Sequence, residues 1–135
     1  MKTKILWMAA GLAAACAVTG CVQTVTDKQT VGIPLIRDSM EGQYDRSVEQ
    51  VFQAAKKVLD KAGTVTIFST LPNQTNLVRT LEAKVNQRNV YVRIEAVSPN
   101  ITSLAVQTRT PGGATDLTLA QALKEEIALA LVGTR

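Results

Sequence analysis

The sequence predicts a single α+β domain, a two-layer sandwich with two helices on one face of an antiparallel sheet of about four to five strands. Two segments carry apolar residues at the three- and four-residue spacing of a helix, and five carry the alternation of a strand. Their order is strand, helix, four strands, helix, which favours helices packed on one face of the sheet. The 135 residues suit one domain, and a hydrophobic content of 46% with 19% charged residues indicates a folded chain.

The first strand and the first helix are expected at residues 39–45 and from residue 48 to about 62. The alternating polarity of the first segment suits a short edge strand. Ser47 and Gln50 have the spacing of a capping box, and Gly63 is a natural helix stop. The apolar helical positions are Val48, Val51, Phe52, Ala55, Val58, Leu59 and Ala62.

Four extended segments follow, at residues 64–69, 76–85 and 88–97 and after the turn at residues 98–100. In the first of them Val65 and Ile67 alternate with Thr64, Thr66 and Phe68. The short connection at residues 86–87 predicts a hairpin. In the other three, the inward apolar positions are Leu77, Leu81, Ala83, Val85, Val90, Val92, Ile94, Ala96, Leu104 and Val106. The side chains expected in water are Glu82, Lys84, Arg93, Glu95, Gln107 and Arg109.

The closing helix is expected to begin after a cap at Thr115 or Asp116 and to run to about Val132. One apolar stripe contains Ala120, Leu123, Ile127 and Leu131. Further apolar residues, Leu119, Ala122, Leu129 and Ala130, make this helix more apolar than one sheet contact requires. Most such residues belong to a core, but Leu119 and Leu129 are candidates for a contact with a partner or a second copy.

The amino-terminal residues have the layout of a secretory signal peptide. Lys2 and Lys4 precede an apolar run from Ile5 to Val18, which is shorter than the ~20 residues of a membrane-spanning helix. The formal charge is +4, and without these two lysines it is 13 − 11 = +2. So small a surplus argues against nucleic-acid binding.

The tetrapeptide Val18-Thr19-Gly20-Cys21 resembles the lipobox of bacterial lipoproteins. The resemblance implies a diacylglyceryl group on the Cys21 sulfur, cleavage before Cys21 and acylation of the new amino terminus. Two or three acyl chains would hold the protein on a membrane almost permanently. The alternatives are an ordinary signal peptide with a chance cysteine and an uncleaved anchor. Cys16 is a poorer lipobox match.

The expected organisation is a signal peptide at 1–20, an acylated cysteine and tether at 21–38, and one periplasmic domain at 39–135. Val22, rather than Asp, follows the cysteine, which favours the outer membrane in the enterobacterial pattern of lipoproteins. If Cys16 is removed and Cys21 is acylated, no thiol remains to form a disulfide. The core must then depend on packing alone.

The order of motifs resembles a family of small bacterial lipoproteins grouped as a domain of unknown function. The motifs are the lipobox, residues 41–44 before the Ser47 helix, the Val90-Tyr91-Val92-Arg93-Ile94 strand, residues 106–109 and a Gly-rich turn before the last helix. These are patterns of hydrophobicity, and the turn at residues 112–115 is longer than that family suggests. The resemblance implies no catalytic residue.

The chain contains no histidine, which excludes His-dependent triads and the usual zinc ligand sets. No catalytic residue, cofactor or metal is expected. Glu82 and Glu95 are a weak candidate pair for a carboxylate hydrolase, because cross-strand ion pairs with Lys84 and Arg93 explain them better. Ser47 is better explained as a helix cap than as a nucleophile.

The candidate contact surface consists of Tyr91, Arg93 and Arg109 on the outer sheet face, together with Arg79. Arg79 is in phase with the apolar residues Leu77 and Leu81, so it is either a rim arginine whose stem packs or an anion contact. The sequence favours a non-enzymatic envelope lipoprotein, anchored at Cys21, that binds another envelope component, such as a protein, or acts in assembly. The alternative is a periplasmic binder of a small or lipidic ligand between sheet and helices. The oligomeric state does not follow from the sequence.

Overall fold

The computed structural model describes residues 20–23, 29–32, 38–72 and 77–133. Two short strands precede the domain, β1 (Gly20–Gln23) and β2 (Gln29–Gly32). The domain consists of β3 (Ser39–Tyr44), α2 (Val48–Ala62), β4 (Thr64–Pro72), β5 (Leu77–Val85), β6 (Arg88–Ser98), β7 (Ile101–Arg109) and α3 (Leu117–Val132).

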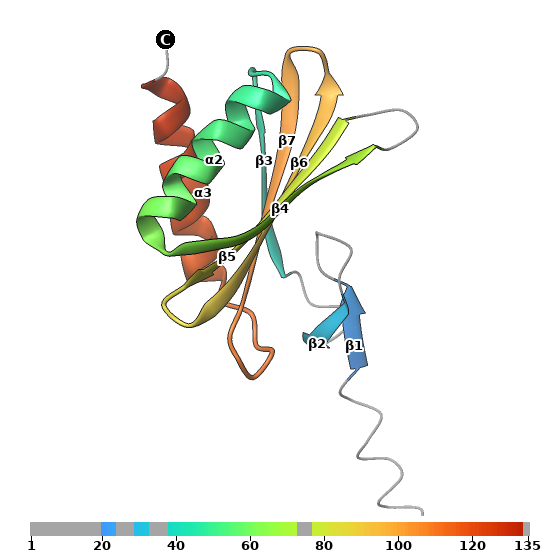
Figure 1. The fold of residues 1–135 in the computed structure, drawn as a ribbon, viewed down its shortest axis with the longest axis vertical. Helices are drawn as coiled ribbons and strands as arrows, with labels where there is room; N and C mark the ends of the chain where they lie inside the picture. Colours follow the sequence, from blue (N-terminus) through green and yellow to red (C-terminus); the bar gives the residue numbers. More distant parts are fainter. Residues whose placement is uncertain (1–19, 24–28, 33–37, 73–76, 134–135) are drawn as a thin grey trace, which may run out of the picture.

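The five strands β3 to β7 form one antiparallel sheet in the order β3-β7-β6-β5-β4. Helices α2 and α3 both lie on one face of this sheet (Figure 1). The predicted α+β sandwich is therefore confirmed, and β3 is an edge strand as expected. The second edge is β4, which the sequence could not identify because it does not reveal strand order.

Helix α2 begins and ends where its sequence predicts. The Ser47 side chain accepts a hydrogen bond from the Gln50 N–H, and the Gln50 side chain accepts one from the Ser47 N–H, which completes the capping box. At the other end, the Gly63 N–H donates to the Leu59 carbonyl over 2.9 Å. At the start of α3, the Asp116 side chain is the cap, because it accepts a hydrogen bond from the Leu119 N–H.

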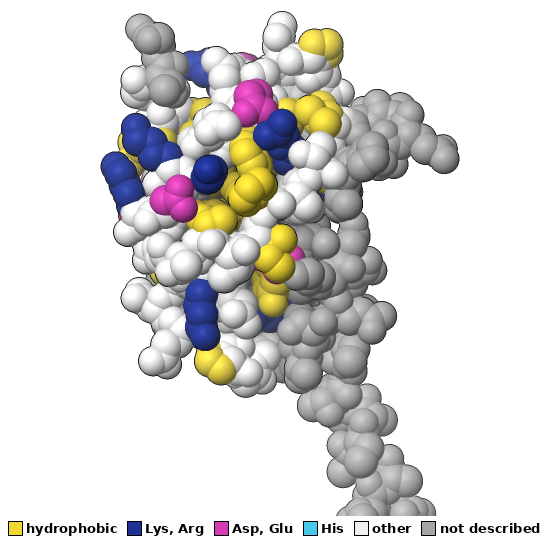
Figure 2. All heavy atoms as spheres, viewed as in Figure 1, with side chains coloured by type: hydrophobic (Ala, Val, Ile, Leu, Met, Phe, Trp, Pro, Cys, Tyr) yellow, Lys and Arg dark blue, Asp and Glu magenta, His cyan; other side chains and the backbone are white. Residues whose placement is uncertain are grey.

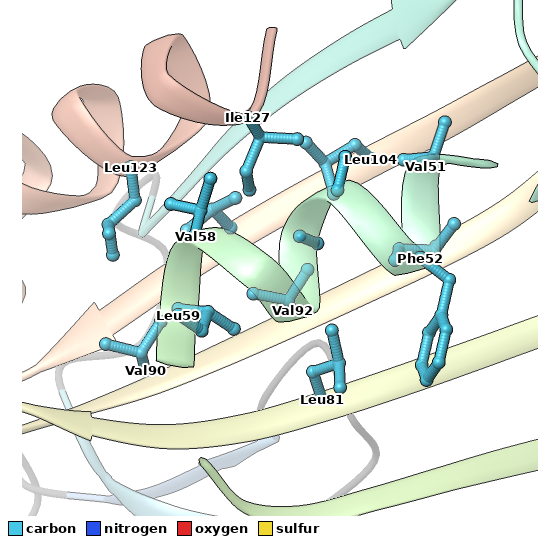
Figure 3. Packing of buried hydrophobic residues seen from close by; sticks show 14 of the residues in the cluster. Val51, Phe52, Val58, Leu59, Leu81, Val90, Val92, Leu104, Leu123 and Ile127 are labelled. Atoms are coloured by element: carbon cyan, nitrogen blue, oxygen red, sulfur yellow. The ribbon is translucent and has the colours of Figure 1, made fainter. Parts of the chain in front are cut away.

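The core fills the layer between the sheet and the two helices. Figure 3 shows side chains from α2, α3 and the sheet pointing into this layer. Fully buried members are Val51, Ala55, Leu59, Leu81, Val90, Val92, Ile94, Leu104, Val106, Ala120 and Ile127. Burying each Val, Leu or Ile side chain is worth about 1.5–3 kcal/mol, so this layer is the main source of stability. No helix in the described part of the chain is long and apolar enough to cross a membrane.

Strand β4 departs from the expected alternation. Val65 lies opposite Ala83, whereas Ile67 lies opposite Glu82, because a bulge interrupts the register between them. The expectation that Val65 and Ile67 share a face is wrong. Past the bulge, Phe68 lies opposite Leu81 and takes the place on the helix side that Ile67 would have had.

The expected hairpin between β5 and β6 is present. Its two turn residues, Asn86 and Gln87, have φ values of 49° and 65°. Two consecutive positive φ values are typical of a type I′ turn, whose twist matches that of the flanking strands.

The tether contains more structure than its sequence predicts. Strands β1 and β2 pair antiparallel, with Cys21 opposite Val31, in a sheet separate from the domain. Val22, Thr30 and Val31 suit this pairing, because β-branched residues favour strands. Removal of residues 1–20 would take only Gly20 from β1 and nothing from the five-stranded sheet.

Replacing Gly63 by Ala should destabilise the domain by about 1–3 kcal/mol, as overpacking usually does. A Cβ at this position would lie 2.1 Å from the Lys84 carbonyl oxygen, so α2 would have to move away from the sheet. Gly112→Ala is the matched control, because its Cβ would meet only the Thr110 hydroxyl at 4.0 Å. Urea unfolding of both variants measures the difference, and equal stabilities would contradict the close approach.

Candidate functional site

The predicted site residues do not form one cluster. Tyr91, Arg93 and Arg109 belong to the strand positions that face away from the helices, whereas Arg79 lies on the helix face. The proposed lipidation residue Cys21 and the lipobox residue Gly20 are in β1. Val18 and Thr19 lie outside the described residues.

Arg109 is not in water, contrary to the prediction. Its side chain is 2% exposed and forms an ion pair with Asp38. A second guanidinium nitrogen donates to the Gly113 carbonyl over 3.1 Å. Burial of a charge is tolerated when it is paired and hydrogen-bonded, and Asp38 and Gly113 satisfy this requirement. Arg109 thus has a structural role: it joins Asp38, just before β3, to the β7–α3 connection. We call the Arg109–Asp38 ion pair the clasp.

Other outer-face side chains are also buried. Gln107, which was expected in water, is fully buried and donates to the Asp38 carboxylate over 2.7 Å. Val78 is only 1% exposed although it is outside the core cluster. Thr80 is buried and shares a hydrogen bond with Ser69. The face away from the helices is thus only partly solvated: Gln107, Thr80 and Val78 are buried, whereas Tyr91 and Arg93 are partly exposed.

The remaining charged residues of this face do not form an acid–base pair. Arg93 lies 3.4 Å from Glu95, and both side chains are partly exposed. Glu82 lies opposite Tyr91, four residues along β6 from Glu95. At about 3.3 Å per residue this spacing is roughly 13 Å, more than the ~5–9.5 Å that separates glycosidase carboxylates. Within the described residues no group of three or more His, Cys, Asp or Glu could hold a metal ion.

Arg79 is both a rim arginine that packs against the core and a contact for an anion, the two roles that its position among the apolar residues of β5 suggested. Its guanidinium lies over the Phe52 ring, 4.5 Å from the centroid, so the side chain packs at the rim of the core. It also contacts a carboxylate, because Nη2 lies 3.0 Å from Oε2 of Glu49 on α2. The carboxylate that Arg79 binds is therefore supplied by the chain itself.

Sequence reasoning missed the most exposed apolar surface of the sheet. We call it the β4 surface; it is the helix-side surface of β4 at Phe68, with Lys56 of α2 beside the Phe68 ring. Phe68 is 66% exposed, whereas Ile67, which is 44% exposed, lies on the opposite face of the sheet. The Lys56 ammonium lies 5.7 Å from the centroid of the Phe68 ring. Figure 2 shows hydrophobic side chains gathered near the middle of the face that β4 crosses, with Lys and Arg side chains beside them.

The β4 surface lies beside the free edge of β4, the last strand in the order of the described sheet. Among the described strands, β5 alone pairs with β4, so the other edge of β4 has no strand partner in this part of the chain. None of its nine residues is charged, whereas the opposite edge strand β3 carries the exposed Glu41. Proteins commonly protect edge strands with charged side chains, so a long uncharged edge is suited to pairing with another strand.

Two surface cavities accompany the helices. One, of about 280 Å³, is lined by residues of α2 and by Ala130 of α3. The other, of about 340 Å³, lies beside the end of β3 and the end of α3 and is lined in part by Tyr44. Burial raises the pKa of the Tyr44 phenol above its ordinary value of 10.0.

Removing the clasp should destabilise the domain more than removing a surface charge pair. Arg109→Met should cost about 1.5–3 kcal/mol, the range for hydrogen bonds to charged groups, because Asp38 loses its cation. Urea unfolding of Arg109→Met, Asp38→Asn and the double variant forms a thermodynamic cycle. We expect a coupling energy above about 0.5 kcal/mol between the two sites. Additive effects would contradict the clasp.

Comparisons with known proteins do not assign the chain to a family. No family model matches it, and no curated protein sequence matches it. Among solved structures, it matches the crystal structure of the di-domain ARO/CYC StfQ from the steffimycin biosynthetic pathway, with a TM-score of 0.33 and 11% identity. The match covers 69% of this chain and 43% of that chain. A TM-score this low supports neither a shared fold nor a shared function.

Proposed function

We propose that the chain is a lipid-anchored protein of the bacterial cell envelope whose domain binds an extended segment of another envelope protein. The anchor is Cys21, and the domain faces the periplasm from the outer membrane. The binding role is non-enzymatic. The observation that carries it is the uncharged edge strand β4 with its exposed Phe68.

The separation between anchor and domain supports this proposal. The five-stranded sheet begins at Ser39, which is 39 − 21 = 18 residues after Cys21. Among the described residues, the buried core extends from Val48 to Leu131, and Met40 and Tyr44 of β3 pack against it. Acyl chains on Cys21 would therefore determine location without altering the fold.

Tethering also explains why a modest binding surface is sufficient. A domain held on a membrane meets its membrane-bound partners at a high effective concentration. A partner strand added to β4 would gain main-chain hydrogen bonds along the edge and an apolar contact with Phe68. The ammonium of Lys56 beside that ring favours a partner segment with an acidic residue next to an apolar one.

The alternative, a small or lipidic ligand between sheet and helices, has less support. Side chains from both layers interdigitate in this space, and Leu81, Val92 and Ile127 are 0% exposed. The two cavities described above lie beside the helices, and exposed residues contribute to the lining of both.

Changing Cys21 to Ser should release the protein from membranes without changing the stability of the domain. The reason is that the sulfur would carry the lipid, while the described core residues and those packed against them lie between Met40 and Leu131. Membrane fractionation measures the release, and urea unfolding of the released variant measures stability. A variant that remains in the membrane fraction would contradict the anchor.

A photoreactive residue at Thr70, on the exposed β4 edge, should crosslink to one other envelope protein in intact cells. The same residue at Gln43, on the opposite edge strand, is the matched control and should give no such product. Phe68→Asp should reduce the Thr70 crosslink at least tenfold, because it places a charge in the apolar contact. Equal crosslinking from both edges, or crosslinking only to a second copy of the chain, would contradict the proposed partner.

A further inference from the structure

We infer that two copies of this chain associate through the outer surface of the helix layer, α2 and α3 of one copy against α3 and α2 of the other. This surface, which we call the helix groove, comprises the α2–α3 cavity with Leu129, Glu126 and Lys57 around it. It is distinct from the β4 surface and its inference does not depend on the proposed function.

The shape of the groove is self-complementary. The cavity of about 280 Å³ is lined by Glu49, Gln50, Gln53, Ala54, Lys57 and Ala130. Next to Ala130 on α3, Leu129 is 71% exposed, and Val132 one turn further along is 68% exposed. A two-fold axis requires that each copy present both a projection and a recess. Leu129 is such a projection, and the adjacent cavity is the recess.

The charges of the groove are also self-complementary. Lys57 lines the cavity from α2. Glu126 lies four residues before Ala130 and thus on the same side of α3. Both side chains are charged, and neither has an ion-pair partner among the described residues. In a two-fold arrangement that places α3 of one copy on α2 of the other, Lys57 of each copy meets Glu126 of its partner.

A second copy fits this surface better than a membrane does. Exposed Glu125 and Glu126 lie within one turn of Leu129, and carboxylates there would be repelled by an anionic lipid surface. A second copy instead supplies Lys57 as a cation for Glu126. It also covers the outward apolar residues of α3, which is more apolar than a helix with one buried face needs to be.

Charge reversal provides a direct test, carried out by sedimentation on the full chain as isolated from its host. The unmodified chain should form dimers. Lys57→Glu and Glu126→Lys should each weaken association at least tenfold, because each self-pairing then brings like charges together twice. An equimolar mixture of the two variants should regain the original affinity within about threefold, because both contacts of the mixed pair are again opposite in charge.

This mixture also separates a broken interface from a misfolded variant, because a misfolded chain would not recover on mixing. Leu129→Asp should weaken association at least tenfold, whereas Val97→Asp, at an equally apolar exposed position on β6, should not. The inference is overturned if the unmodified chain is monomeric at about 100 μM, if the mixture fails to associate, or if Leu129→Asp instead abolishes binding to anionic vesicles.

Discussion

The structure depends on one contact, the apolar layer in which α2 and α3 cover a single face of the five-stranded sheet. All five strands of this sheet and both helices contribute to it, from Met40 in β3 to Leu131 near the end of α3. Because the layer contains the main apolar contacts, the domain does not require a disulfide or a bound metal to explain its cohesion. The sheet edges and outer helix surfaces are therefore left to interact with other molecules.

A second, polar contact connects the tether to the opposite face of the same sheet. Asp38 accepts hydrogen bonds from Gln107 and forms an ion pair with Arg109, at the point where the chain enters β3. The same arginine holds the β7–α3 connection through Gly113. Close by, Asp116 caps α3 and pairs with Arg88, so charged groups from distant parts of the sequence meet at one end of the sheet. This arrangement fixes where an anchored chain would leave the domain.

Periodicity predicted the elements well because the buried face of each element is continuous. In β6, Val90, Val92 and Ile94 are all fully buried, as strict alternation requires. The bulge in β4 could not be predicted, because it depends on how β4 is registered against β5. Arg109 was misplaced for a related reason: its burial depends on Asp38, which is 71 residues away in the sequence.

The candidate surfaces also depend on tertiary pairing that the sequence does not reveal. An uncharged segment such as residues 64–72 is visible in the sequence, but only the strand order reveals that it forms an exposed edge. The sequence indicated that Leu129 is an apolar residue beyond those the core needs. The structure shows that Leu129 is 71% exposed on the outer side of the last helix. Identity and spacing of residues thus predict what an element can bury, whereas tertiary pairing decides what it leaves uncovered.

The central claim is that acyl chains on one residue hold an independently packed domain in the cell envelope. Mass spectrometry of the amino-terminal peptide of the native protein tests it most directly. The account predicts a peptide that begins at Cys21 and carries the added mass of a diacylglyceryl group and an amide-linked acyl chain. A peptide that begins at Met1, or one in which Cys21 carries no lipid, would contradict it.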